Sequence, residues 1–296
     1  MRLRSARAPL VGLAACALLR AHDTGPLHPD DLWSAWQFDP GVVVPILVAA
    51  VLYTRGARRS RGVAPRHAIF FWTGMAALAL ALVSPLHPLG EVLFSGHMAQ
   101  HELLMLVAAP LLVLSRALVP FLWGIPFSWR RAAGSLSKAQ VVQSAWHHLT
   151  EPLSAWWIHA AVLWIWHVPV LFQATLESDL VHTAQHLSFF VSALLFWWSL
   201  FYSRPGYGIA VLYVFTTAIH TGILGALLTF SPIVLYPAYS ATAPLWGFTA
   251  LEDQQIGGLI MWVPAGLIYT VAGLILFAAW LRESDAALER RRRYAE

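Results

Sequence analysis

The sequence has almost no cysteine, since Cys16 is the only one in 296 residues. The rest of the chain therefore has no disulfide framework, no thiolate ligand and no cysteine nucleophile. Any metal site in it must use imidazole, thioether, carboxylate or amide groups.

Charged residues are also scarce, at 11% of the chain, whereas roughly a quarter is usual in soluble domains. Hydrophobic residues make up 58%, and several apolar segments approach the ~20 residues that cross a lipid bilayer. These features predict an all-α protein that spans the membrane several times. The net charge of +4 does not indicate a nucleic-acid partner, because the basic residues lie in short clusters between apolar segments.

Catalytic motifs are absent as well. The sequence contains no Ser, His and Asp in a convincing triad order, no phosphate-binding glycine loop and no His-Glu-x-x-His motif. We therefore predict that the protein is not an enzyme.

The first 21 residues have the pattern of a signal peptide. Three arginines precede a short apolar segment, and Ala15, Cys16 and Ala17 give the small-x-small spacing of a cleavage site. The same stretch resembles a lipobox with Cys16 as the lipidated residue, so cleavage, lipidation and retention all stay open. We expect an extracytoplasmic segment at 22–39, a transmembrane domain at 40–281 and a basic cytoplasmic tail at 282–296.

Seven apolar segments predict a seven-helix transmembrane bundle. They cover about 40–54, 65–83, 97–115, 150–171, 182–203, 208–230 and 255–281. Asp39 followed by Pro40 fits an N-cap and a first helical position. Of the 19 Lys and Arg residues, 15 follow the odd-numbered segments and none follows the second, fourth or sixth. Because Lys and Arg favour the cytoplasmic side, we predict that the N-terminus is outside and the C-terminus is cytoplasmic.

The motif His-x-Ala-Gln-His occurs twice, at 97–101 and 182–186, with an offset of 85 residues. Histidines at positions i and i+4 lie on one face of a helix. Both copies open segments that start on the outer side, so all four histidines should lie at the outer end. Since ionisable residues in a membrane rarely face lipid, we expect a polar site inside the bundle.

Other polar residues converge on the same leaflet. The metal-ligand candidates are His97, His101, His182, His186 and Asp253, and the cofactor-ligand candidates are His159, His167 and His220. Asp253 has three interpretations: a ligand, a hydrogen-bond partner of a ligating imidazole, or the cap of the last helix. His87, His147 and His148 look like solvated loop residues.

Imidazole binds copper, zinc, iron and haem iron, so the pattern does not select one of them. Met98, Met105 and Met261 are further candidate ligands for Cu(I), although methionine at helical spacing is more often core filler. The simplest alternative is that the His and Gln side chains only join helices by hydrogen bonds. The pair Gly257 and Gly258 favours close helix packing.

These stretches resemble the CtaG family of assembly factors for caa-type cytochrome c oxidases. The matching residues are His97, Gln100 and His101, then Leu103, Leu104 and 109–114, then Trp157, His159, Trp166, His167 and Pro169, then His182, Gln185 and His186, and finally 253–255, Gly257, Gly258, Met261 and Trp262. The resemblance implies a multi-pass protein of the bacterial plasma membrane that helps to deliver or insert copper. Its implied partners are cytochrome c oxidase subunits and extracytoplasmic copper chaperones. A haem-binding or haem-transferring protein, a scaffold without metal, and a transporter are the alternatives.

Overall fold

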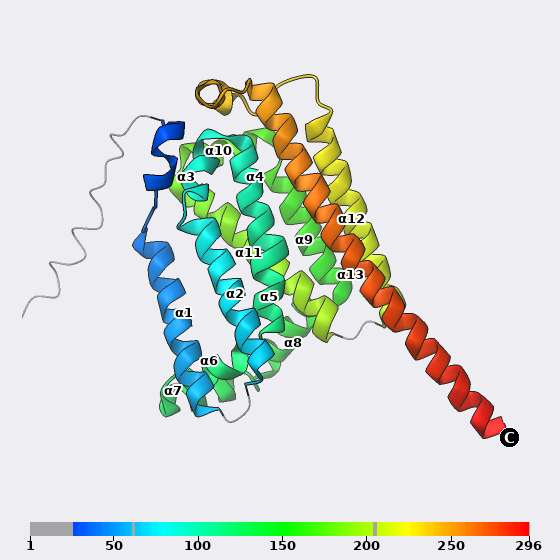
Figure 1. Ribbon diagram of the computed structural model, residues 1–296. Coiled ribbons are helices and arrows are strands. Elements are labelled where there is room, and N and C mark those ends of the chain that lie inside the picture. Colours follow the sequence, from blue (N-terminus) through cyan, green and yellow to red (C-terminus); the bar gives the residue numbers. More distant parts are fainter. Residues whose placement is uncertain (1–25, 61–62, 204–205, 296) are drawn as a thin grey trace, which may run out of the picture.

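The computed structural model describes residues 26–60, 63–203 and 206–295, and this part of the chain is helical and has no strand (Figure 1). Six of its helices are long and apolar enough to cross a membrane, or seven if one bent pair counts as a single span. The predicted all-α membrane fold is thus confirmed. The signal-like segment with Cys16 lies outside the described residues.

The long helices follow the predicted segments in order. They are α1 (Pro40–Arg59), α2 (Pro65–Leu82), α4 (Phe94–Glu102) with the π-helical η3 (Leu103–Ala108) and α5 (Ala109–Leu114), α9 (Pro152–Trp166), α11 (Asp179–Tyr202), α12 (Tyr207–Thr229) and α13 (Ala250–Ala295). The connecting helices are α3 (Leu86–Val92), α6 (Leu118–Gly124), α7 (Phe127–Leu136), α8 (Gln140–Thr150) and α10 (Pro169–Glu177). The described residues also form three short 3-10 turns: η2 (Pro29–Ser34), η4 (Pro237–Ser240) and η5 (Ala243–Trp246).

Helix α1 begins as predicted. The Asp39 carboxylate accepts a hydrogen bond of 2.7 Å from the Gly41 N–H, and Pro40 occupies the first helical position. The helix ends later than predicted, at Arg59 instead of Thr54, because Arg58 and Arg59 in its last turn suit the negative end of the helix dipole.

The fourth predicted segment, at 150–171, corresponds to a bent pair of helices and not to one continuous helix. Its two parts, α9 and α10, meet at an angle of 74°. Proline disfavours helical geometry in the residue before it, and Val168 before Pro169 is extended, with ψ 124°. The bend leaves His167 as the C-cap that follows the last residue of α9, Trp166.

The third segment begins three residues earlier than predicted and contains a π-helical turn. In this turn the Ala109 N–H donates to the Leu104 carbonyl, five residues back. The next donor in that series would be Pro110, which has no N–H. The carbonyl of Met105 instead accepts a hydrogen bond of 2.9 Å from the Trp197 indole of α11. The π turn therefore accommodates a proline and links two central helices.

Helices α12 and α13 lie side by side at one edge of the bundle (Figure 1). Their close approach depends on glycine, because a Cβ on Gly258 would lie 2.8 Å from the Gly225 carbonyl oxygen. A Cβ on Gly257 would likewise collide with the ring of Phe94 on α4. The two glycines thus set the distance of α13 from two different helices.

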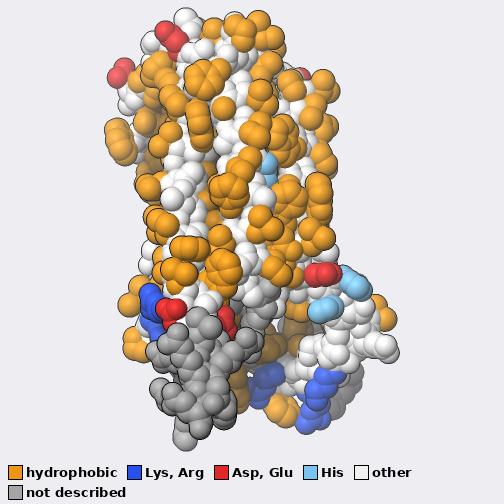
Figure 2. Space-filling view, turned by 90° about the vertical axis from the view of Figure 1, so that its right-hand side faces the viewer, with side chains coloured by type: hydrophobic (Ala, Val, Ile, Leu, Met, Phe, Trp, Pro, Cys, Tyr) orange, Lys and Arg blue, Asp and Glu red, His pale blue; other side chains and the backbone are white. Residues whose placement is uncertain are grey.

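The two ends of the bundle differ. One end, here called the site end, carries η2, α3, α10 and η4, and the opposite end carries α6, α7 and α8 (Figure 1). On the face seen in Figure 2, hydrophobic side chains cover the long middle and Lys and Arg gather at the opposite end. This distribution agrees with the charge asymmetry of the sequence. The orientation across the membrane stays a prediction.

Candidate metal site

The two His-x-Ala-Gln-His motifs face each other near the site end. One lies on α4 and the other on α11, and their four imidazole rings are in contact. The ring centroids are 4.3 Å apart for His97 and His101, 4.3 Å for His182 and His186, 5.1 Å for His101 and His186, and 5.3 Å for His97 and His182. All four side chains are buried. The structure therefore brings together the four histidines that were predicted as ligands, although the two motifs lie 85 positions apart in the sequence.

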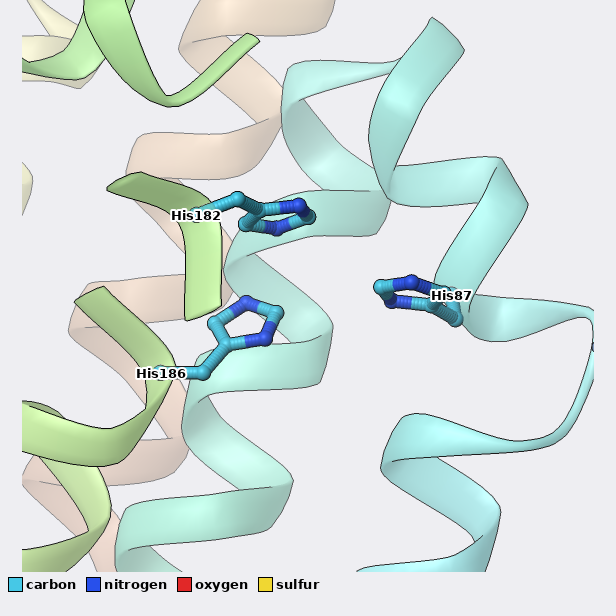
Figure 3. A group of neighbouring side chains, drawn as sticks. All are labelled: His87, His182 and His186. Carbon is cyan, nitrogen blue, oxygen red and sulfur yellow. The ribbon is translucent and has the colours of Figure 1, made fainter. Parts of the chain in front are cut away.

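Two groups of three histidines have ligand atoms that all lie within 4.8 Å of one another. The buried group consists of His97, His101 and His186. The cavity group consists of His87, His182 and His186. Figure 3 shows the cavity group, with His182 and His186 on α11 and His87 opposite them on α3. His186 belongs to both groups.

The prediction that His87 is a solvated loop residue was wrong. The segment after Ser84 and Pro85 folds into α3 and packs against α4, so His87 is half-buried. The Gln100 amide donates a hydrogen bond of 2.8 Å to the His87 Nδ1 atom. This glutamine belongs to the first motif, so the motif orients a third histidine that sequence spacing did not reveal.

Several of these imidazole nitrogens have no hydrogen-bond partner among the described residues. They are both ring nitrogens of His101 and the Nε2 atoms of His167, His182 and His186. Buried polar atoms in proteins are nearly always hydrogen-bonded, because an unpaired one costs about 1–3 kcal/mol. Imidazole nitrogens of this kind are able to bind a metal ion.

Two of the neighbouring histidines have their rings oriented by hydrogen bonds. The His167 Nδ1 atom donates to the Leu163 carbonyl at 2.7 Å, which leaves a lone pair on its Nε2 atom. The His97 ring lies between two oxygens, the Gly90 carbonyl, 3.3 Å from Nδ1, and the Gln185 Oε1 atom, 3.1 Å from Nε2. Both motif glutamines thus contact a histidine on another element, a role to which their repetition in the sequence pointed.

The segment between α12 and α13 closes the site with two buried tyrosines. The Tyr239 hydroxyl donates to the Gly90 carbonyl at 3.0 Å, and the Tyr236 hydroxyl donates to the His167 carbonyl at 2.9 Å. Burial raises the pKa of both hydroxyls, most strongly that of Tyr239, so both stay protonated and able to donate. These bonds fix the backbone around His97 and His167.

Asp253 belongs to neither three-histidine group. Its carboxylate accepts hydrogen bonds from the Phe94 N–H at 2.6 Å and from the Ser95 N–H at 3.1 Å, so it caps α4. The interpretation as a cap of its own helix was wrong, because Thr249 and Glu252 cap α13 through reciprocal hydrogen bonds. We therefore leave Asp253 out of the candidate ligand set.

His159 and His220 join neither three-histidine group. The His159 Nδ1 atom is 3.1 Å from the Ser192 hydroxyl, and its ring stacks on Phe196. His220 lies edge-on to Trp156, with ring centroids 5.4 Å apart. The cofactor-ligand prediction for these two residues stays a prediction.

The three candidate thioether ligands, Met98, Met105 and Met261, pack in the main apolar core.

Glu102, which follows His101, has a buried Oε2 atom with no hydrogen-bond partner in the described part of the chain. Sequence reasoning missed Glu102, although a carboxylate inside an apolar segment is itself a functional signal.

Comparison with known proteins decides the family. A family model described as cytochrome c oxidase caa3 assembly factor (Caa3_CtaG) matches residues 51–283, which include every histidine of both groups. The chain belongs to this family. The resemblance seen in the sequence is thus confirmed.

Curated proteins similar to this chain occur in mycobacteria. Proteins of Mycobacterium bovis and Mycobacterium tuberculosis, each named only as uncharacterised, are 27% identical over 280 residues. One from Mycobacterium leprae, also named uncharacterised, is 23% identical over 282 residues. Each alignment covers 89% of this chain and 42% of the relative, so the chain spans about two fifths of the length of these relatives. No solved structure matches the chain.

Proposed function

We propose that this caa3 assembly factor helps to deliver or insert copper into cytochrome c oxidase, with the histidine cluster as the copper-binding site. The observation that carries the proposal is the set of buried imidazole nitrogens without hydrogen-bond partners in the two three-histidine groups. The ion is cargo in this role, and the protein performs no catalysis on it.

The donor set supports Cu(I) among the ions that imidazole binds. Three neutral imidazoles bring no negative charge, so a singly charged ion costs less to bury beside them than a doubly charged one. The absence of a thiolate suits a carrier that must release its ion, since thiolates bind copper more tightly than imidazole does.

The packing of the rings supports an ion over a haem. Neighbouring rings in the buried group have centroids 4.3 Å and 5.1 Å apart, which leaves space for an ion but not for a porphyrin between them. The sidedness also suits copper transfer. If the loops rich in Lys and Arg face the cytoplasm, the cluster lies on the extracytoplasmic side of the plasma membrane, within reach of copper chaperones.

Metal analysis of the purified protein tests the proposal. We expect the wild-type protein, loaded with Cu(I) without oxygen and then desalted, to retain copper. The double variant His101→Ala and His186→Ala should retain none. The matched control is His147→Ala with His148→Ala, two exposed histidines on α8 at the opposite end, which should retain as much as wild type.

A cellular experiment separates copper delivery from a purely structural role. In a strain that lacks the gene, oxidase should assemble with reduced copper content, and the double variant should fail to restore it. Full restoration by the double variant would instead support a scaffold in which the histidines only join helices.

A further inference from the structure

The cavity group is the part of the cluster that an ion from outside would meet first. A cavity of about 440 Å³ reaches His87, His182 and His186. Its lining also includes Asp39 and Asp179, two exposed carboxylates at the N-terminal ends of α1 and α11. Carboxylates at the mouth of a cleft raise the local concentration of cations.

Exposure falls steadily from this cavity into the bundle. The His87 side chain is 20% exposed, His182 and His186 are 8% exposed, His101 is 2% exposed and His97 is fully buried. The cavity lining includes all three members of the cavity group but neither His97 nor His101. The cavity thus reaches the buried group through the shared residue, His186.

We propose that the cavity group captures the ion and passes it to the buried group by ligand exchange around His186. The bonds to His87 and His182 break as the bonds to His97 and His101 form, while His186 stays bound throughout. The ion keeps its oxidation state, so the step needs no electron donor. This inference rests on the proposed copper-handling function and assigns a new role to His87.

The hydrogen bonds of His87 and His101 favour an exchange of the first for the second. The His87 Nδ1 atom already accepts a hydrogen bond from Gln100, which places the ring proton on Nε2 of the neutral imidazole. An ion at His87 must therefore displace this hydrogen bond or the proton. His101 has no hydrogen bond to lose, because both of its ring nitrogens are unpaired. Binding at His101 therefore breaks no hydrogen bond, although binding at His97 breaks its contact with Gly90 or Gln185. The exchange of His87 for His101 is the one that favours the buried group.

The test compares rates and equilibria of copper uptake. The full chain in lipid nanodiscs is mixed, without oxygen, with the coloured Cu(I)–bicinchoninate complex, and the loss of colour gives both. We expect His87→Ala to slow uptake at least about tenfold, with a much smaller change in the final dissociation constant. His101→Ala should keep fast uptake and weaken the final affinity by at least about 10–100-fold, the loss that mutation of a hydrogen-bond partner of a metal ligand already causes. His186→Ala should impair both.

Controls and outcomes distinguish this inference from the proposed function. His28→Ala removes an exposed histidine next to η2 at the site end and should match wild type. His87→Gln, which keeps a polar side chain, guards against misfolding and should slow uptake as His87→Ala does. Wild-type uptake rates in both His87 variants would overturn the inference and leave the proposed function intact. Equal losses of affinity in His87→Ala and His101→Ala would also overturn it, because they indicate one site. A wild-type protein that takes up no Cu(I) would overturn both.

Discussion

The Asp253→Asn substitution tests whether this carboxylate positions the site or binds the metal. Asp253 is fully buried and accepts hydrogen bonds from the Phe94 and Ser95 backbone and from the Ser95 hydroxyl. Hydrogen bonds to a charged acceptor contribute about 1.5–3 kcal/mol each. Asparagine keeps one acceptor oxygen, loses the charge and turns an N–H₂ group toward a donor. We expect the free energy of unfolding to fall by about 2–4 kcal/mol.

The assay is thermal unfolding of the purified protein in nanodiscs, paired with its Cu(I) affinity. The matched control is Glu252→Gln, the same chemical change at the residue before Asp253. Because Glu252 is exposed, this substitution should have a smaller effect on stability. Because α4 carries His97 and His101, Asp253→Asn should weaken copper binding only in proportion to the loss of helix stability. Unchanged stability together with complete loss of copper would refute this reasoning and make Asp253 a ligand.

Two further predictions concern the scaffold around the site. Gly258→Ala should destabilise the protein by about 1–3 kcal/mol, because its Cβ would meet the α12 backbone. Gly266→Ala should not destabilise it, because there is open space around that Cβ. Equal thermal unfolding of the two variants would contradict the packing argument. Trp197→Phe should leave the Met105 carbonyl unpaired and cost about 1–3 kcal/mol. Pro110→Ala restores an N–H donor near that carbonyl, so a double-mutant cycle should show a smaller cost of Trp197→Phe in the Pro110→Ala background. Additive costs of the two substitutions would contradict the role of the Trp197 hydrogen bond in the π turn.

The sequence predicted the membrane class and the pairing of the two motifs for physical reasons. Apolar segments long enough to cross a bilayer have few alternatives to helices. Two same-face histidine pairs at equivalent depths then point to one polar site. The cap at Asp39 was likewise visible, because it involves neighbouring residues only.

The rest depended on contacts between distant segments. His87 follows a proline-containing break that looks like a loop, and only the packing of α3 against α4 and α11 brings it to the cluster. Asp253 is 158 positions from Ser95, whose N–H and hydroxyl it binds, so local capping rules assigned it to the wrong helix. Pro169 is a local signal for the bend before it. The length of the apolar segment nevertheless favoured the prediction of one continuous span.

X-ray absorption spectroscopy of the Cu(I)-loaded protein tests the central claim most directly. We expect the atoms bound to Cu(I) to be imidazole nitrogens, without sulfur. This set of ligands should be lost in the His101→Ala and His186→Ala double variant. A sulfur ligand in that set, or an unchanged spectrum in the double variant, would contradict the claim.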